Sequence, residues 1–374
     1  MSTHSKHIRI AIDCRDLFVA KTGSKTYLSE FIHAAAQLNQ SDAELVQLYP
    51  IFPLIRLNGK LGKLIKHLQF FFWKQISLPL SVKLKNCDVL ICTDYFLPSI
   101  KFNIKHIVVF HDAFFWEYPE HYGTFWLKLF HSWAVPSAKN AEVILTPSHY
   151  VKNRLIHFME VKREKISVVF EAPKSFINDH NKGASTSFSN CSPYLLHVGA
   201  LNKHKNLPRL IKAFKLAIAS SGESWNLMLV GGKVHSSKDD DSSLIIQTIH
   251  QEGLVDRVHL IGHVDDKELE EYYKNAKGYI FPSYNEGFGL PMLEAMKFNL
   301  PIAAANNTCL PEIGGNGAIY FDPFDVNEIA QAILQIIYIE KIVEDSLAQQ
   351  PTVLSSYSWK KAALEITDIC KAIS

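Results

Sequence analysis

Short β-rich apolar runs alternate with stretches of helical spacing along the chain, and this alternation restricts the fold more than any other feature of the sequence. The runs of the N-terminal half are 8–12, 89–92, 107–110, 143–145 and 168–170, and those of the C-terminal half are 195–198, 227–230, 258–261, 279–281 and 302–304. Helical spacing is found over 27–38, 207–219 and 269–276. Strands that alternate with helices predict a parallel sheet with helices on both faces. We therefore expect an α/β fold of two doubly wound, Rossmann-like domains that face each other across a cleft.

A polar stretch over 178–190, rich in Asn, Ser, Gly and Lys, is the best candidate for a linker between the two domains. The 374 residues exceed the usual size of a single domain, which agrees with such a division. The predicted domains are 1–177 and 191–355, with 178–190 as the linker and 356–374 as a separate last segment.

The composition excludes several classes of protein. With 47% hydrophobic and 20% charged residues, the chain can bury large cores and does not belong to the disordered class. Its six cysteines include no CxxC pair, so neither a disulfide framework nor a zinc site is expected. No apolar signal-peptide core follows Met1, and no window reaches the ~18 apolar residues of a membrane span. These features predict a globular cytoplasmic protein with reduced thiols.

The net charge of +2 hides a basic N-terminal half. Residues 1–180 hold 22 Lys and Arg against 15 Asp and Glu, whereas residues 181–374 hold 17 against 22. The excess is concentrated in the acid-free basic segment 56–85, which also contains the aromatic run 70–73. Its basic residues are Arg56, Lys60, Lys63, Lys66, Lys74, Lys83 and Lys85.

Lysines in this basic segment stand beside Leu61, Leu64, Ile65 and Leu68, a spacing that predicts an amphipathic helix. One interpretation is that this helix docks on an anionic membrane surface, with the run 70–73 adding apolar burial and the protein peripheral on the inner face of the membrane. The other is a helix packed on its own domain with a solvated basic face. Nucleic acid is not an expected partner, since no nucleic-acid motif accompanies the charge.

Two loops that follow predicted strands have features of phosphate-binding loops. Gly199 comes directly after the run 195–198, and His204 and Lys205 follow just before a helix that Asn206 is placed to cap. The glycine lets the backbone turn, and the basic side chains beside a helix N-terminus make a site for a diphosphate. The Gly-Gly-Lys stretch 231–233 follows the next strand and could also approach a ligand closely, although an ordinary tight turn explains it equally well.

The strongest motif follows the run 279–281 and reads Glu286-Gly-Phe-Gly-Leu-Pro-Met-Leu-Glu294. Pro291 fits the first turn of a helix, so the N–H groups of 287–290 point outward at a positive helix end, which can bind a phosphate. Glu286 and Glu294 flank that anion site and would repel a bare phosphate, so we expect their partners to be hydroxyl groups. A nucleotide sugar fits, with Glu286 toward the sugar and Glu294 toward the ribose. The alternative is that Glu294 only favours the helix dipole and Glu286 is solvated.

The two glutamates, with seven residues between them, resemble the E-x7-E motif of the retaining family 4 glycosyltransferases, which have the GT-B fold. Further segments resemble that family in order along the chain: Asp13-Cys14-Arg15, Val109-Phe110-His111-Asp112, Thr146-Pro147-Ser148, Leu310-Pro311-Glu312 and Tyr320-Phe321-Asp322-Pro323. The segment 356–374 resembles the family's last helix, which crosses back to the N-terminal domain. The resemblance implies retaining, metal-independent transfer of a hexose-type sugar from a GDP- or UDP-sugar, for example GDP-mannose. The implied acceptor is a glycan or a lipid-linked acceptor in cell-surface polysaccharide synthesis.

The resemblance also implies roles for single residues. Lys205 would neutralise the donor diphosphate, Glu286 would bind hydroxyls of the transferred sugar, and His111 would close over that sugar; these three are the predicted catalytic residues. The predicted donor-binding residues are Gly199, His204, Lys205, Gly231, Gly232, Lys233, Val264, Glu286, Gly287, Phe288, Gly289, Leu290 and Glu294. On the acceptor side the predicted residues are Gly23, Ser24, Lys25 and Asp112.

The chain departs from the family pattern at several positions. His204 stands where the family usually has arginine, which replaces a fixed charge with a titratable one. Residues 299–301 and 306–308 also differ from the usual pattern. The acidic triplet 239–241 is interpreted as a solvated loop, so no metal or other cofactor is expected. A phosphorylase or hydrolase of similar architecture and a non-catalytic nucleotide-sugar-binding protein are the alternatives.

Overall fold

The computed structural model describes residues 7–20, 23–38, 42–50, 59–175, 192–221, 224–232 and 238–374, with the side chains of 59–61, 63, 220 and 221 left out. The predicted linker 178–190, Arg56 and Lys233 therefore lie outside the described residues, as do the side chains of Lys60, Leu61 and Lys63.

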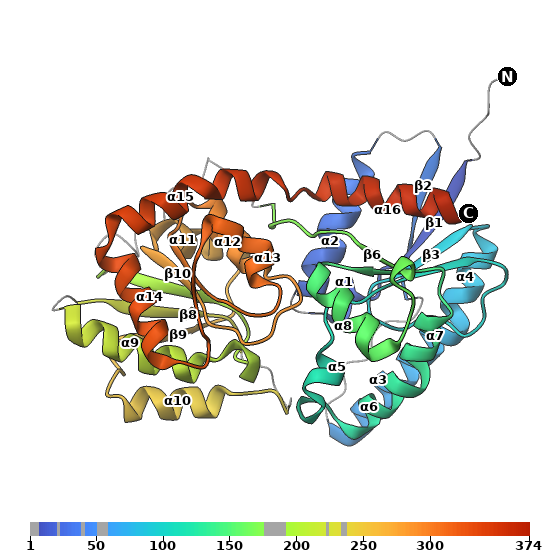
Figure 1. Ribbon diagram of the computed structural model, residues 1–374. Coiled ribbons are helices and arrows are strands. Elements are labelled where there is room, and N and C mark those ends of the chain that lie inside the picture. The colour runs from blue at the N-terminus through green and yellow to red at the C-terminus, as the bar shows by residue number, and fades with distance from the viewer. Residues whose placement is uncertain are drawn as a thin grey trace. The chain divides into compact units, whose positions relative to one another are not determined.

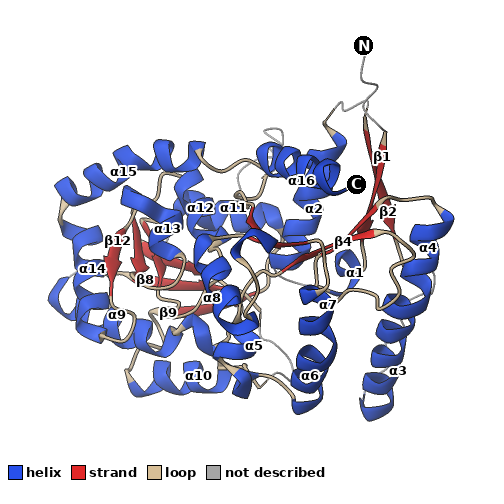
Figure 2. Ribbon diagram, turned by 45° about the vertical axis from the view of Figure 1, so that its right-hand side comes forward, coloured by secondary structure: helices blue, strands red, loops and turns tan. Residues whose placement is uncertain are grey.

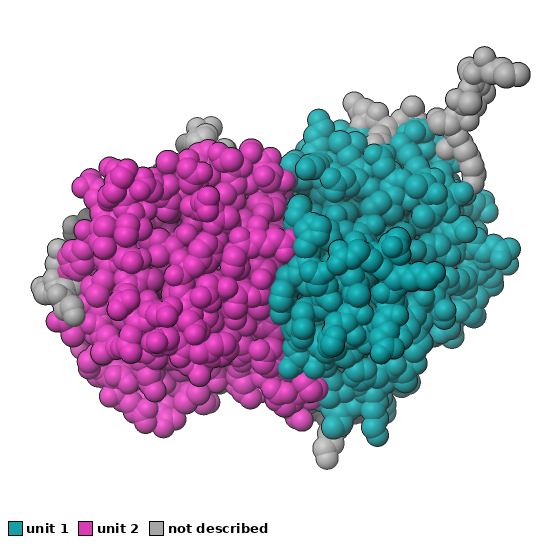
Figure 3. All heavy atoms as spheres, in the orientation of Figure 1, with its two compact units in different colours: residues 1–117, 123–171, 358–374 teal, residues 118–122, 172–357 magenta. Residues whose placement is uncertain are grey.

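The chain divides into two compact units, coloured separately in Figure 3. Unit 1 contains 1–117, 123–171 and 358–374, and unit 2 contains 118–122 and 172–357. Two features of this division stand out. The short segment 118–122 belongs to unit 2 although it lies in the N-terminal half of the sequence, and the last helix belongs to unit 1.

Each unit is built on a six-stranded, fully parallel sheet, and Figure 2 shows helices packed around the strands of both sheets. The strands of unit 1 are β1 (Ile8–Asp13), β2 (Ala43–Leu48), β3 (Val89–Cys92), β4 (Lys105–Val109), β5 (Val143–Thr146) and β6 (Ile166–Val168). Those of unit 2 are β7 (Tyr194–Val198), β8 (Asn226–Val230), β9 (Val258–Gly262), β10 (Gly278–Phe281), β11 (Ile302–Ala305) and β12 (Ile319–Phe321). The predicted α/β class with two doubly wound domains is confirmed.

Helices connect successive strands and also follow the last strand of the chain, as Figure 1 shows. In unit 1 they are α1 (Asp16–Val19), α2 (Gly23–Ala36), α3 (Gly59–Phe72), the π-helix η1 (Trp73–Ser77), α4 (Leu78–Leu84), α5 (Phe114–Glu117), α6 (Thr124–Leu129), the π-helix η3 (Phe130–Ala134), α7 (Val135–Lys139), α8 (His149–Met159) and α16 (Trp359–Ile373). In unit 2 they are α9 (Leu207–Ser221), α10 (Ser242–Gln251), α11 (Asp266–Asn275), α12 (Leu290–Lys297), α13 (Leu310–Gly314), α14 (Val326–Tyr338) and α15 (Glu340–Ser355).

The order of the strands places one switch point in each sheet. Unit 1 has the order β2-β1-β3-β4-β5-β6, so the chain leaves β1 toward one side and returns to its other side with β3. Unit 2 has the order β12-β11-β10-β7-β8-β9, which puts the corresponding point between β7 and β10. Ligands of doubly wound sheets bind beyond the carboxyl ends of the strands at such points. Ligand-binding residues are therefore expected in the loops after β1 and β3 and after β7 and β10.

The sequence analysis missed the two edge strands β2 and β12. Both are half-exposed, whereas the central strands β3, β5, β10 and β11 are buried along their whole length. A central strand of a parallel sheet is covered on both faces and reads as a continuous apolar run. An edge strand carries fewer apolar residues, so its sequence signal is weaker.

Helix α16, the last helix of the chain, packs in unit 1 rather than in unit 2. Trp359 at its start is 7% exposed and meets the ring of Tyr27 edge-on at 5.6 Å between ring centroids. Near its end, Lys371 Nζ lies 2.7 Å from Asp42 Oδ2. Figure 1 shows α16 in red beside α2 in blue, so the two ends of the sequence meet in this unit.

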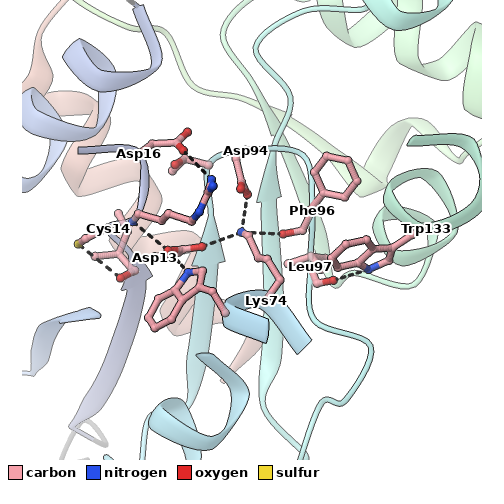
Figure 4. A network of polar contacts seen from close by, with 12 residues as sticks. Asp13, Cys14, Asp16, Lys74, Asp94, Phe96, Leu97 and Trp133 are labelled. Carbon is pink, nitrogen blue, oxygen red and sulfur yellow. Dashed lines mark hydrogen bonds and ion pairs between the residues drawn. The ribbon is translucent and has the colours of Figure 1, made fainter. Parts of the chain in front are cut away.

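A buried ion network holds the switch point of unit 1 (Figure 4). The fully buried Lys74 points its ammonium group between Asp13, at the end of β1, and Asp94, just after β3. Its Nζ lies 2.6 Å from Asp13 Oδ2 and 2.5 Å from Asp94 Oδ1, and it donates to the carbonyl of Phe96 at 3.0 Å. Trp73 Nε1 donates to the second oxygen of Asp13 at 2.9 Å. The two carboxylates hold the pKa of Lys74 well above its ordinary value although burial opposes this.

This network corrects part of the interpretation of the basic segment 56–85. Lys74 cannot face a membrane, and neither can Phe70 or Trp73, which are 4% and 3% exposed and belong to the core. Trp73 and Lys74 lie in η1, where the helix is wider by one residue per hydrogen bond, and Phe70 lies in α3 just before it. The predicted amphipathic helix itself is confirmed as α3.

We predict that Lys74→Met destabilises unit 1 by about 3–5 kcal/mol, because it leaves the buried carboxylates of Asp13 and Asp94 without their shared counter-ion. The matched control is Lys66→Met, an exposed lysine of the same helical segment, which should change the unfolding free energy by less than about 0.5 kcal/mol. Chemical denaturation monitored by tryptophan fluorescence measures both. Equal unfolding midpoints for the two variants would contradict the assignment.

Candidate functional site

The loops after β7 and β10 bring the strongest predicted residues of unit 2 together. Lys205, in the short turn Lys203–Lys205 after β7, places its Nζ 2.5 Å from Oε1 of Glu286, which follows β10. The side chains of the two residues are only 12% and 11% exposed. Burial would raise the pKa of Glu286, but the positive charges of Lys205 and His204 outweigh it and hold that pKa below its ordinary value. Glu286 is therefore an ionised, nearly buried carboxylate.

The loop after Glu286 is tightly built before α12 begins. Gly289 is the N-cap of α12 and has φ of 99°, a left-handed conformation that favours glycine. A Cβ there would lie 2.8 Å from Leu310 and 3.2 Å from Phe281, so a larger residue would not fit. Pro291 stands in the first turn of α12, as the sequence predicted. The loop 287–289 thus meets a helix N-terminus beside Lys205 and Glu286, the arrangement expected of an anion site.

Glu294 lies inside unit 2 on α12. It is 6% exposed, and its Oε2 accepts a hydrogen bond from the hydroxyl of the buried Tyr273 at 3.0 Å. Burial raises the pKa of Glu294. The tyrosine fixes the carboxylate in place, and the predicted role of Glu294 toward the ribose stays a prediction.

The glycine loop after β8 packs closely against the neighbouring loops. Gly231 has φ of 150°, and a Cβ there would lie 1.8 Å from the carbonyl oxygen of Gly199. The N–H of Gly199 donates to Val230 O, and that of Gly231 to Gly262 O. Close packing of loops therefore explains Gly231 without any ligand. Gly232 and Val264 are half-buried in loops at the same edge, and their predicted donor-binding role stays a prediction, as does that of Lys233.

Asn206 corrects a prediction, because its side chain does not cap α9. The side-chain amide instead donates to the carbonyls of Pro282 and Pro323, and Oδ1 accepts from Arg209. The residue adopts a left-handed conformation with φ of 59°. It ties together the loops after β7, β10 and β12.

A second correction concerns the acidic triplet 239–241, which is not a solvated loop. Asp241 is 9% exposed, and Asp239 lies against two histidines. Nδ1 of His204 is 3.3 Å from Asp239 Oδ2, and Nδ1 of His121 is 2.9 Å from Asp239 Oδ1. His121 and Asp239 were missed because 118 residues of sequence separate them and neither follows a predicted strand.

In unit 1, His111 follows β4 and is held on both sides of its ring. Nδ1 lies 3.3 Å from Glu171 Oε1, and Nε2 lies 3.0 Å from the carbonyl oxygen of Thr93. Both partners are acceptors, so both ring nitrogens must carry protons. In agreement, the pKa of His111 is raised: burial lowers it, but Glu171 and Asp112 outweigh that effect. His111 is thus a cationic, well-fixed side chain, and its predicted contact with the sugar stays a prediction.

The other predicted residues of unit 1 divide into two groups. Both carboxylate oxygens of Asp112 accept hydrogen bonds within the unit, from the Phe114 N–H and the Tyr95 hydroxyl, each at 3.0 Å. Tyr95 has φ of 68°, which is uncommon for an aromatic residue and fixes the loop after β3. Gly23, Ser24 and Lys25 form the first turn of α2, where Gly23 and Lys25 are exposed. They follow β1, so they belong to the same sheet edge as Asp112.

Exposed apolar residues form a stripe along the continuous helical segment 59–84, and this apolar stripe consists of Leu64, Leu68, Phe72, Ile76, Leu80 and Leu84, which are 42% to 81% exposed. Residues four apart advance by about 40° around a regular helix. On a regular helix a row of such residues would therefore turn gradually around the axis, and the wider turn of η1 reduces this rotation. Among the described residues, no helix is long and apolar enough to span a membrane.

Comparisons with known proteins agree with this architecture. The Glycosyltransferase Family 4 profile matches residues 38–171, and the Glycosyl transferases group 1 profile matches residues 181–349. The chain is 26% identical over 296 residues to O-antigen chain mannosyltransferase B of Escherichia coli, which covers 75% of each chain. It is 29% identical over 272 residues to O-antigen chain mannosyltransferase RfbU of Salmonella typhimurium, which covers 71% of this chain and 69% of that one.

The fold is similar to that of a solved sucrose-phosphate synthase from Thermosynechococcus elongatus. The TM-score is 0.74 at 16% identity, over 98% of this chain and 99% of that chain. The two profiles lie in succession along the sequence, and each includes most of the strands of one sheet. With two doubly wound sheets and the E-x7-E glutamates at the switch point of the second, the chain belongs to the family 4 glycosyltransferases and has the GT-B fold.

Proposed function

We propose that the protein transfers a hexose from a nucleotide sugar to a glycan or lipid-linked acceptor in the synthesis of a cell-surface polysaccharide, with retention of the anomeric configuration. The observation that carries the proposal is the buried pair of Lys205 and Glu286 beside the N-terminus of α12. A cation and a helix N-terminus suit a diphosphate, and an adjacent ionised carboxylate suits sugar hydroxyls. The relatives named as O-antigen mannosyltransferases support mannose as the sugar. GDP-mannose is the donor that we propose for it.

In the proposed reaction the bond from the sugar to the donor phosphate breaks, and a bond from the sugar to the acceptor oxygen forms on the same face. The acceptor proton leaves with the nucleoside diphosphate. Negative charge develops on the departing phosphate, where Lys205 and the helix N-terminus stabilise it. We propose that these groups supply the charge for a metal-independent reaction. Glu294, fixed by Tyr273, would hold the ribose.

The ion pair between Lys205 and Glu286 has a consequence for binding. The carboxylate competes with the donor diphosphate for the lysine. In the free protein, Glu286 therefore already neutralises part of the positive charge that the diphosphate would meet. A phosphorylase-like enzyme or a non-catalytic nucleotide-sugar-binding protein remains the alternative. A phosphorylase would transfer sugar to inorganic phosphate and a binding protein would transfer none, so neither would move sugar from a nucleotide sugar to an acceptor.

We predict that Lys205→Ala weakens the binding of GDP or UDP by about 10- to 100-fold, because a charge-assisted contact of about 1.5–3 kcal/mol is lost. Glu286→Gln should leave that affinity unchanged or raise it, since the neutral amide no longer competes for Lys205. Calorimetric titration measures both, and the control is Lys212→Ala on the exposed side of α9. Unchanged affinity in Lys205→Ala would remove the diphosphate assignment.

We also predict that Glu286→Gln and His111→Ala lower the rate of sugar transfer by about 100-fold or more, because each removes a charge proposed to act on the transferred sugar. Transfer from a panel of radiolabelled nucleotide sugars, GDP-mannose included, measures the rate. The control is Glu340→Gln, an exposed site on α15. If the loss of nucleotide affinity equals the loss of rate in either variant, its assignment to the sugar is wrong.

We propose that the protein docks on an anionic bilayer through the apolar stripe. The stripe lies along a segment without acids, and Lys66, Lys83 and Lys85 are exposed on the same helices. Six apolar side chains over 20 residues extend about 30 Å. Of the run 70–73 that the sequence suggested, this arrangement keeps Phe72 but not Phe70 and Trp73, which are buried.

We therefore expect the wild-type protein to co-sediment with vesicles containing phosphatidylglycerol at low salt, and less so at high salt, as screening weakens about 1 kcal/mol per lysine. Leu64→Gln combined with Leu68→Gln and Phe72→Gln should abolish binding. The matched control is Leu244→Gln with Ile246→Gln, two residues of α10 that are 47% and 45% exposed. Binding by the triple variant at the wild-type level, or no wild-type binding at low salt, would contradict docking.

A further inference from the structure

The cluster of His121, Asp239 and His204 links three segments of unit 2 that are distant in sequence. His121 ends the short turn Pro119–His121, Asp239 precedes α10, and His204 belongs to the turn that carries Lys205. The side chains of His121, Asp239 and His204 are 9%, 15% and 10% exposed. Each oxygen of the carboxylate lies within 3.3 Å of a different imidazole Nδ1.

Backbone hydrogen bonds fix this cluster to the loops of the donor site. The N–H of Lys203 donates to Asp239 O at 2.9 Å, and that of Asp241 donates to Leu201 O at 2.9 Å. The N–H of Tyr284, two residues before Glu286, donates to His204 O at 3.0 Å. The ring of Tyr284 also lies 5.4 Å from that of Tyr118, in the same segment as His121. The Asp239 loop is therefore tied to the loops after β7 and β10.

A positive charge on His204 acts on Glu286 in the site. It is one of the groups that hold the pKa of Glu286 low, next in effect to Lys205. His204 also stands next to Lys205, the residue assigned to the diphosphate. A positive imidazole at this position would therefore add to the field that a diphosphate meets.

We propose that Asp239 is a positioning residue for donor binding: it holds the Nδ1 side of His204 so that the opposite edge of the ring, charged at low pH, faces the donor diphosphate, while Nδ1 of His121 lies 2.9 Å from the other carboxylate oxygen. The proposal rests on the proposed function, because it names how one loop of that site is regulated. A carboxylate that orients an imidazole through one nitrogen commonly fixes the chemistry of the other. Histidine loses its charge between about pH 5 and 8, so donor affinity follows pH.

The groups around the two imidazoles define that pH dependence. His204 faces Asp239, Lys205, Glu286 and the neutral His197, whose pKa of about 4 results from burial. His121 faces Asp239, Glu120, Lys203 and His204, and its pKa is lowered because burial outweighs the two carboxylates. Burial thus disfavours the charged form of His121.

The experiment is a calorimetric titration of GDP and UDP between pH 5.5 and 8.5 with four forms of the full-length protein: wild type, His204→Arg, Asp239→Asn and the double variant. The nucleotide titrates as well, so the His204→Arg curve serves as the reference. Relative to it, we expect wild-type affinity to fall by about 5- to 10-fold from pH 5.5 to 8.5, a loss that the fixed charge of arginine avoids. In Asp239→Asn the fall should move to lower pH, whereas in the double variant the profile should match the His204→Arg reference.

A purely structural role of Asp239 would give the same loss of affinity at every pH in both backgrounds, and that result overturns the proposal. Identical wild-type and His204→Arg profiles overturn it too. Should Asp239→Asn fail to fold, NMR titration of the His204 ring in the wild type replaces it: saturating GDP or UDP must move the titration midpoint upward. A midpoint that does not move contradicts the proposal. If Lys205→Ala leaves nucleotide binding intact, the proposed function itself fails, which is a separate outcome.

Discussion

The structure of unit 1 depends on one buried ammonium group. Lys74 joins Asp13 at the end of β1 to Asp94 after β3, and so fixes the loops on both sides of the switch point. The buried Lys74 and the exposed Ile76 of the apolar stripe both belong to the π-helix η1. Burial and the nearby carboxylates of Asp94 and Asp13 raise the pKa of Asp16 to about 7. Such a charge network is costly to bury and tolerates no loss of its cation.

Unit 2 has a different strand order from unit 1 and different chemistry at the carboxyl ends of its strands. There Lys205 is paired with one carboxylate, that of Glu286, and lies beside the helix N-terminus of α12. In unit 1 the lysine is fully buried and enclosed by two carboxylates and a carbonyl, whereas Lys205 is partly exposed. The lysine of unit 1 is therefore structural, and that of unit 2 is suited to exchange its partner for a diphosphate.

Histidines occupy several positions where charge matters. His111 is held between a carboxylate and a carbonyl and is cationic, His197 is buried and neutral, and His204 shares Asp239 with His121. Their different states follow from the number of acceptors that surround each ring and from its burial. His204, at a position where the family usually has arginine, has its Nδ1 3.3 Å from Oδ2 of Asp239.

The sequence by itself determined the α/β class, the central strands and the E-x7-E site, because continuous apolar runs, glycines and paired glutamates are local signals. It also indicated Lys205 and Glu286 as partners of one ligand, although not that they pair with each other. Tertiary structure alone decided what depends on contacts across long stretches of sequence. Lys74 and Phe70 are buried although their segment reads as a basic surface, Asn206 bonds across loops instead of capping α9, and Asp239 meets His121 and His204. The physical reason is that burial and ion pairing are properties of neighbours in space, which parallel strand order brings together and local sequence does not encode.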